Sequence, residues 1–185
     1  LGVTGNVIWN NCHTKEGYQI GKMLVGTYNG GYLIAGMEEN ITADTVKAYV
    51  LKLDSLGNFE WDRYYTMGND ARFFTVQQTP WDGGYIFGGM GYSTATGYDM
   101  FVVKTDSIGD TLWTRHYGGI YHDCACQIVP NTSLQDYEAG SPIEYIMTAC
   151  WYDSENWWES KSYIAKLDSV GGIIWQHKFT NYPDF

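Results

Sequence analysis

The segment of the sequence best suited to chemistry is "WYDSENWWES" at residues 151–160. It places aromatic rings directly beside carboxylates and an amide, at Trp151, Tyr152, Asp153, Glu155, Asn156, Trp157, Trp158 and Glu159. Flat apolar rings framed by hydrogen-bonding groups suit the CH face of a sugar ring or an anchor residue of a protein partner. The alternative is that some of these rings pack between structural units, above all Trp151. We expect a binding surface made by Trp157, Trp158, Tyr152, Asp153 and Glu155.

A histidine and two cysteines alternate along the chain at His122, Cys124 and Cys126. In a strand these three side chains would share one face and could offer metal ligands. A hairpin that sets Cys124 level with Cys150 would instead bring this pair within reach of a disulfide. Because cysteine is among the most often buried residue types, free buried thiols are favoured over a disulfide, and a disulfide over a metal. We therefore expect no metal and no cofactor, and we add Tyr121 and His122 to the predicted binding surface.

The sequence carries little evidence for catalysis. It contains no GxSxG, HExxH, P-loop or dinucleotide-binding pattern. The most regular carboxylates, Asp54, Asp106 and Asp168, each precede a glycine by three residues. Such a side chain accepts hydrogen bonds from backbone amides two residues on, and the glycine supplies the positive φ of a tight hairpin. These carboxylates are predicted to form turns, so enzymatic activity stays uncertain and binding is favoured.

The turn belongs to a repeat. "KLDSLGNFEW" at 52–61 returns as "KTDSIGDTLW" at 104–113 and "KLDSVGGIIW" at 166–175. Each of these tryptophans follows a glycine by four residues, as does the tryptophan near the start of the chain, giving the series Trp9, Trp61, Trp113 and Trp175. A second marker, "GGYLIAG", "GGYIFGG" and the degenerate "IEYIMTA", runs in step with the first. Two markers in one phase indicate repeated structural units.

The units are predicted to be four-stranded sheets. Apolar residues alternate with period two between the markers, which is typical of β-strands, and no helical period is sustained. In the second unit the strands are expected near 72–79, 84–90, 99–106 and 110–117. Four-stranded units of about 50 residues stacked through apolar faces predict an all-β protein, a β-propeller, with a β-sandwich as the competitor. In a single domain over 1–185, the blades are expected at about 13–65, 66–117 and 118–179, with 1–12 as the outer strand of a preceding blade.

The repeat resembles that of secreted bacterial β-propeller proteins exported by the type IX secretion system. The matching segments are "DGGYIFGG" at 82–89, "DMFVVKTDSIGDTLWTRHYGG" at 99–119 and "DCACQI" at 123–128. The third unit departs from the pattern by losing its "GGY". The resemblance implies that the strands of each blade run in order from the propeller axis outward, and that the protein is extracellular or lies on the cell surface.

Composition narrows the range of partners. A formal net charge of -10 repels nucleic-acid phosphate, which argues against DNA or RNA binding. No run of about 18 apolar residues is present, so no membrane span is expected. An aromatic content of 17% with few lysines is common in extracellular all-β proteins. The expected partner is a protein or a glycan.

The predicted architecture is about three blades plus one extra N-terminal strand. An outer strand without its own blade exposes an edge that needs a partner. The chain is therefore expected to be a segment of a larger ring, or to be completed by another chain that pairs with the N-terminal strand. The predicted function is that of a non-catalytic scaffold or recognition module. One alternative is a carbohydrate-active enzyme, either a hydrolase or a lyase, with acidic site residues from several blades. The other is a purely structural spacer.

Overall fold

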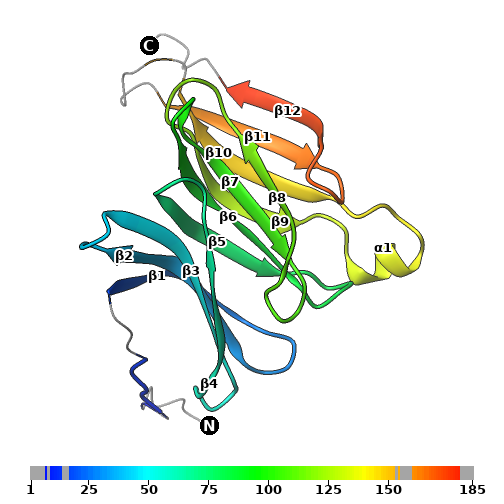
Figure 1. The fold of residues 1–185 in the computed structure, drawn as a ribbon. Coiled ribbons are helices and arrows are strands. Elements are labelled where there is room, and N and C mark those ends of the chain that lie inside the picture. Colours follow the sequence, from blue (N-terminus) through cyan, green and yellow to red (C-terminus); the bar gives the residue numbers. More distant parts are fainter. Residues whose placement is uncertain (1–6, 8, 14–16, 153, 155–159, 180–185) are drawn as a thin grey trace.

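The computed structural model of the chain describes residues 7, 9–13, 17–152, 154 and 160–179. This part of the chain folds into twelve strands and one short helix (Figure 1). In chain order the elements are β1 (Tyr18–Gly26), β2 (Tyr32–Asn40), β3 (Thr45–Leu53), β4 (Phe59–Tyr65), β5 (Ala71–Gln78), β6 (Tyr85–Ser93), β7 (Gly97–Thr105), β8 (Thr111–Tyr117), β9 (Cys124–Pro130), α1 (Leu134–Glu138), β10 (Tyr145–Trp151), β11 (Lys161–Leu167) and β12 (Ile173–Phe179).

The strands form three antiparallel sheets of four consecutive strands each. Sheet 1 holds β1 to β4, sheet 2 holds β5 to β8, and sheet 3 holds β9 to β12. Figure 1 shows the three sheets packed together in chain order, as propeller-like blades. The predictions of an all-β class and of four-stranded units are confirmed, and the strands of sheet 2 begin and end close to their predicted positions. The described residues do not close a ring.

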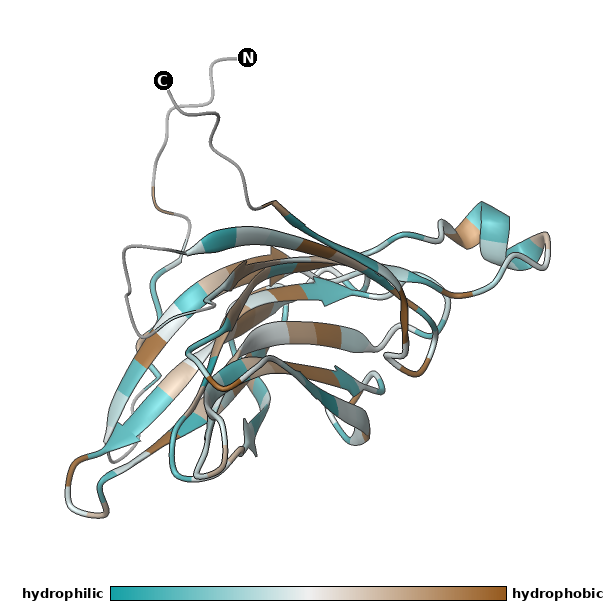
Figure 2. Cartoon of the chain, turned by 90° about the horizontal axis from the view of Figure 1, so that it is seen from above, coloured by the Kyte–Doolittle hydropathy of each residue, from teal (hydrophilic) through white to brown (hydrophobic). Residues whose placement is uncertain are grey.

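The sheets are held together by apolar side chains that alternate along each strand. Phe73 of β5 stacks on Phe87 and Phe101, with ring centroids 4.9 and 5.7 Å apart. Tyr65 of β4 joins them from sheet 1, with its ring centroid 5.5 Å from that of Phe73. Hydrophobic bands cross the strands where the sheets face one another (Figure 2). β5 and β9 each pack against three strands of the preceding sheet, so the first strands of sheets 2 and 3 lie at the interface with the sheet before them.

The predicted "DSxG" turns are confirmed. The Asp54 carboxylate accepts hydrogen bonds from the amides of Leu56 and Asn58, both at 2.8 Å. Asp106 and Asp168 make the corresponding pairs of bonds in sheets 2 and 3. The glycines of the three turns have φ angles of 79°, 85° and 80°, at Gly57, Gly109 and Gly171. The aspartates are therefore occupied in holding the hairpins.

A tryptophan of the preceding sheet also lies against the turn glycines Gly109 and Gly171. A Cβ on Gly109 would lie 2.9 Å from the Trp61 ring, and one on Gly171 would lie 3.0 Å from the Trp113 ring. A side chain at either position would press on the tryptophan ring, and the positive φ would strain it as well. Tyr65 donates its hydroxyl hydrogen to the Gly109 carbonyl at 2.7 Å, and Tyr117 does the same to Gly171 at 2.6 Å. We call this arrangement of tryptophan, tyrosine and turn glycine the Trp–Gly junction.

The N-terminal segment makes the same contact without forming a strand. The Trp9 ring lies 2.7 Å from the position of a Cβ on Gly57, and its centroid is 5.6 Å from that of Tyr32. The Asn11 amide donates to the Gly57 carbonyl at 2.9 Å, and His13 Nε2 lies 3.0 Å from the same oxygen. Residues 1–12 were predicted to form the outer strand of a preceding blade; the described ones among them, 7 and 9–12, lie outside the twelve strands. The side chains of Trp9, Asn11 and His13 contact sheet 1.

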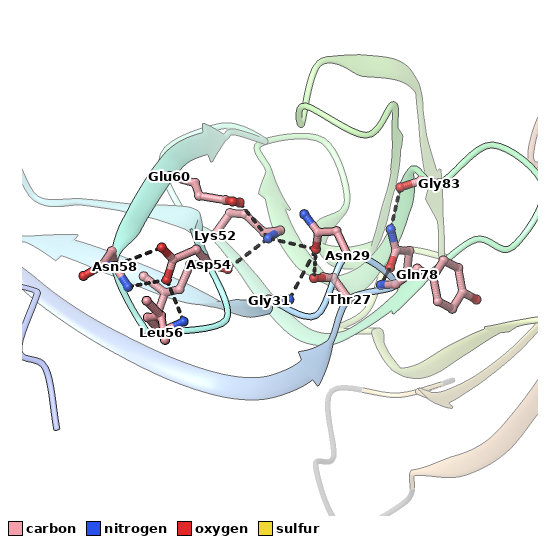
Figure 3. Close-up of polar contacts among 12 residues, drawn as sticks. Thr27, Asn29, Gly31, Lys52, Asp54, Leu56, Asn58, Glu60, Gln78 and Gly83 are labelled. Carbon is pink, nitrogen blue, oxygen red and sulfur yellow. Dashed lines mark hydrogen bonds and ion pairs between the residues drawn. The ribbon is translucent and has the colours of Figure 1, made fainter. Parts of the chain in front are cut away.

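A lysine is buried beside each junction between described sheets. Lys52 is 2% exposed and donates to Glu60 at 2.7 Å and to the Leu53 carbonyl at 2.9 Å (Figure 3). Lys104 is equally buried and pairs with Asp82 at 2.7 Å, although burial still lowers its pKa. In sheet 3, Glu144 replaces the second glycine of the "GGY" marker and pairs with Lys166 at 2.6 Å. The residue that makes the third marker degenerate is thus the carboxylate that pairs with the lysine of sheet 3.

The connection between β9 and β10 contains α1. Ser133 caps this helix, accepting a hydrogen bond from the Asp136 amide at 3.1 Å. Figure 1 shows the helix projecting away from the sheets. No helix in the described part of the chain is long and apolar enough to cross a membrane.

The Trp–Gly junction predicts unequal effects of equivalent substitutions. Trp113→Ala removes a ring that packs on Gly171 and donates to the Ser169 carbonyl at 3.0 Å, so we expect a loss of about 2–3 kcal/mol in the free energy of unfolding. Trp175→Ala is the matched control, because Trp175 is 39% exposed and no described sheet follows it. Its expected loss is below about 1 kcal/mol. Urea unfolding of both variants measures the difference, and equal losses would contradict the junction.

Candidate functional site

The loops that link one sheet to the next meet the loops between second and third strands at one edge of the molecule. The Tyr92 amide donates to the Asp70 carbonyl at 2.7 Å, and the Asp123 amide donates to the Tyr98 carbonyl at 2.7 Å. The Tyr152 amide in turn donates to the Asp123 carboxylate at 2.9 Å. Sheet 1 is joined to them by the Val46 amide, which donates to the Asn69 carbonyl at 2.9 Å. We call this edge the rim; its described segments are 38–46, 66–70, 91–99, 118–123, 151–152 and 160.

The rim contains a pocket of about 400 Å³ between sheets 1 and 2. Its lining is mostly polar and consists of Glu39, Asn40, Ile41, Asp44, Thr45, Val46, Asn69, Asp70, Tyr92 and Tyr98. The Tyr92 and Tyr98 rings meet edge to face, with centroids 5.3 Å apart. The pocket therefore offers two aromatic rings beside carboxylates and amides.

Hydrogen bonds fix the polar groups on one wall of this pocket. Arg72 binds both oxygens of the Asp70 carboxylate, through Nε at 2.8 Å and through an η nitrogen at 2.7 Å. Tyr98 donates its hydroxyl hydrogen to the same carboxylate at 2.6 Å. Burial and this bond raise the pKa of Tyr98 to about 12, so the hydroxyl is neutral at physiological pH. Asp70 and Tyr98 are thus held in place before any ligand arrives, which lowers the entropic cost of binding.

A second, more apolar pocket adjoins the first. It has a volume of about 490 Å³ and is lined by Met67, Gly68, Asn69, Tyr92, Ser93, Thr94 and His116. Asn69 and Tyr92 line both pockets, so the Tyr92 ring stands between them. The two pockets together suit an extended ligand more than a small compact one.

The structure describes only part of the predicted binding surface. Trp157, Trp158, Asp153 and Glu155 lie outside the described residues. His122, Tyr121 and Tyr152 are half-buried on the rim, and the His122 ring centroid lies 5.4 Å from that of Tyr98. Tyr98 therefore connects His122 to the pocket between sheets 1 and 2.

Trp151 takes the structural role that was the alternative for it. Its ring centroid lies 5.4 Å from that of Tyr163, and the Lys178 ammonium lies 3.3 Å from the Trp151 centroid. This ring packs against the cluster between sheets 2 and 3. We therefore leave Trp151 out of the candidate site.

Two buried carboxylates lie side by side near the junction of sheets 2 and 3. A Cβ on Gly118 would lie 2.2 Å from Asp99 Oδ1 and 2.8 Å from Asp123 Oδ2. Asp123 accepts hydrogen bonds from the Gly119 and Tyr152 amides, both at 2.9 Å, yet burial raises the pKa of its carboxyl. Thr96 donates to Asp99 Oδ2 at 2.5 Å. Asp123 thereby anchors the two rim loops on either side of it.

The cysteines are arranged differently from the prediction. The cluster of possible metal ligands is Cys124, Cys126 and Cys150, whose sulfurs all lie within 4.8 Å of one another, and His122 is not part of it. Cys124 does lie opposite Cys150 in the β9–β10 pair, as the predicted hairpin requires. All four cysteines are free thiols; Cys124 and Cys150 are half-buried, whereas Cys126 is exposed and so differs from the expected buried thiol. A hydrogen bond from Cys124 lowers the pKa of Cys126 to about 6, while the same contact and burial raise the pKa of Cys124.

The low pKa of Cys126 predicts a reactive thiol. In reduced, chelator-treated protein, alkylation of Cys126 by iodoacetamide should follow a curve with its midpoint near pH 6 and approach its plateau at neutral pH, because the thiolate is the nucleophile. An unstructured cysteine peptide, with an ordinary pKa of about 8.5, is the reference. Mass spectrometry of the labelled peptides measures both rates. A Cys126 midpoint at the value of the reference peptide would contradict the hydrogen-bonded thiolate.

The sequence was also compared with known protein families and with curated proteins, and nothing matches in either case. The resemblance to secreted propeller repeats therefore depends on the repeated residues themselves and on the arrangement of the three sheets. What the protein binds has to follow from the geometry of the rim.

Proposed function

We propose that the chain forms blades of a secreted or cell-surface β-propeller that acts as a non-catalytic recognition module. The regular Trp–Gly junctions support the propeller, because the same contact joins sheet 1 to sheet 2 and sheet 2 to sheet 3. The docked N-terminal segment supports it further. Trp9, Asn11 and His13 meet Gly57 as Trp61 and Tyr65 meet Gly109, so they stand where the outer strand of a preceding blade would lie.

The observation that carries the proposed function is the polar pocket between sheets 1 and 2. It lies on the rim between sheets 1 and 2, and the ring of Tyr98, which lines it, has its centroid 5.4 Å from that of His122, a residue of the predicted binding surface. Tyrosine rings beside fixed carboxylates and amides suit the alternating CH faces and hydroxyls of a glycan. The net charge of -10 favours a neutral or basic ligand over an acidic polysaccharide. We therefore favour a neutral glycan, with a protein partner as the alternative.

A carbohydrate-active enzyme is the rival function, since Glu39, Asp44 and Asp70 line the same pocket. Asp70 is an unsuitable acid or base, because Arg72 and Tyr98 already bind both of its oxygens. Asp153 and Glu155, the carboxylates that the sequence offers for this role, lie outside the described residues. Binding without turnover is thus the better supported of the two functions.

A glycan array followed by titration calorimetry tests the proposal. We expect Tyr92→Ala to weaken binding of the selected glycan at least about tenfold, or 1.4 kcal/mol, because its ring stands between the two pockets. Trp157→Ala combined with Trp158→Ala should also weaken binding, without changing the melting temperature. Tyr28→Ala is the matched control, since Tyr28 is an exposed tyrosine in the loop between β1 and β2, away from the rim.

Three outcomes would overturn the proposal. Unchanged affinity in both rim variants would place the binding site elsewhere. Hydrolysis or elimination of a bound polysaccharide would establish the enzyme instead. Absence of any glycan or protein ligand for the intact polypeptide would leave the structural spacer.

A further inference from the structure

Sheet 3 carries a cluster of three thiols at the rim end of β9 and β10. Cys124 and Cys150 are directly opposite each other in the antiparallel pair, so their side chains share one face. Cys126 joins them because the register shifts between Thr148 and Ala149, which leaves Cys126 as the extra residue of a β-bulge. Bulges re-aim single side chains in this way.

The three sulfurs are spaced for a common ligand. The Cys126 and Cys150 sulfurs are 3.4 Å apart, and all three lie within 4.8 Å of one another. Thiolates bound to one tetrahedral Zn²⁺ at about 2.3 Å are about 3.8 Å apart. Side-chain rotations that move the sulfur atoms by less than about 1 Å would therefore complete the site. Cys126 is exposed and the other two are half-buried, which leaves a path for an ion to enter.

The fold itself does not require these cysteines. The same bulge occurs in sheets 1 and 2, where Lys22 and Phe74 occupy the position of Cys126. The residues that pair beside the bulge are Ile20 with Met37 in sheet 1 and Arg72 with Met90 in sheet 2. Sheet 3 therefore carries a thiol at each of three positions where sheets 1 and 2 carry none. The backbone places them, and packing does not explain their identity.

We propose that Cys124, Cys126 and Cys150 form a three-thiolate site for a thiophilic d¹⁰ cation, Zn²⁺ or Cu⁺. Thiolate is the ligand type that selects these ions over Mg²⁺ and Ca²⁺. Each thiol releases one proton as its sulfur binds the ion. Cu⁺ accepts three thiolates as a complete set, whereas Zn²⁺ keeps a fourth position for water. This inference is independent of the proposed glycan binding, because it concerns a different group of residues.

Titration of the reduced, metal-free full chain with Cd²⁺ tests the site. We expect a thiolate-to-metal charge-transfer band in the ultraviolet that saturates at one ion per chain, and competition by Zn²⁺ and Cu⁺ in separate arms identifies the preferred ion. Cys126→Ser and Cys150→Ser should each weaken binding at least about tenfold. Cys12→Ser is the matched control, because Cys12 is an exposed thiol outside the cluster, and it should bind as the unaltered protein does.

Circular dichroism of the serine variants establishes that lost binding is not lost folding. Absence of the band, or an equal loss in Cys12→Ser, would overturn the proposal. So would native protein that lacks two hydrogens by intact mass and yields a crosslinked peptide between Cys126 and Cys150. That result would assign the close sulfur pair to a disulfide instead.

Discussion

The structure depends on the contact between a large aromatic ring and a glycine of the next sheet. Gly109 has a φ of 85°, which favours glycine in the hairpin, and it has no Cβ, which allows the Trp61 ring to lie against it. The Gly109 carbonyl also accepts a hydrogen bond from the Tyr65 hydroxyl. One residue thus closes a turn within its own sheet and holds the preceding sheet in register. A side chain at Gly109 would disturb both.

The position of the rim follows from this constraint. The junctions hold the last strand of a sheet against a turn of the next sheet, while β5 and β9 pack against three strands of the preceding sheet. The connecting loops lie at the opposite ends of the strands, where backbone hydrogen bonds such as that from Asp123 to Tyr98 join neighbouring sheets. The pocket is a consequence of two sheets meeting at a fixed angle, with side chains from both. The same sheet geometry, with its repeated bulge, places the three thiols.

The sequence predicts the fold well because its repeat is explicit. Each local pattern predicts a local structure: the period-two alternation predicts strands, and the "DSxG" motif predicts the turn before the tryptophan. Because these patterns recur in the same phase, they also indicate that the units have the same structure. The buried lysines could not be foreseen in the same way, because lysine is normally exposed and Lys52 is buried among partners from other parts of sheet 1: Glu60, Asn29 and the Leu53 carbonyl.

The candidate site was predicted less completely than the fold. Strict alternation placed His122 with Cys124 and Cys126, but a bulge at Cys126 breaks the alternation and brings in Cys150 from the neighbouring strand. Nothing in the sequence marks the bulge except its recurrence at Lys22 and Phe74, which share no chemistry with it. The pocket was missed because its residues come from two sheets. The one available signal was the pair of tyrosines in "GYSTATGYD", a loop that the strand order already places on the rim.

We propose that the same junction recurs on the side of sheet 3 where Trp175 and Phe179 are exposed. An experimental structure of the polypeptide as its source produces it, alone or with its partner chains, tests this claim most directly. The account predicts that the Trp175 ring lies against a glycine turn of a further sheet, as Trp61 and Trp113 do here. A Trp175 ring surrounded by water in that complete assembly would contradict it.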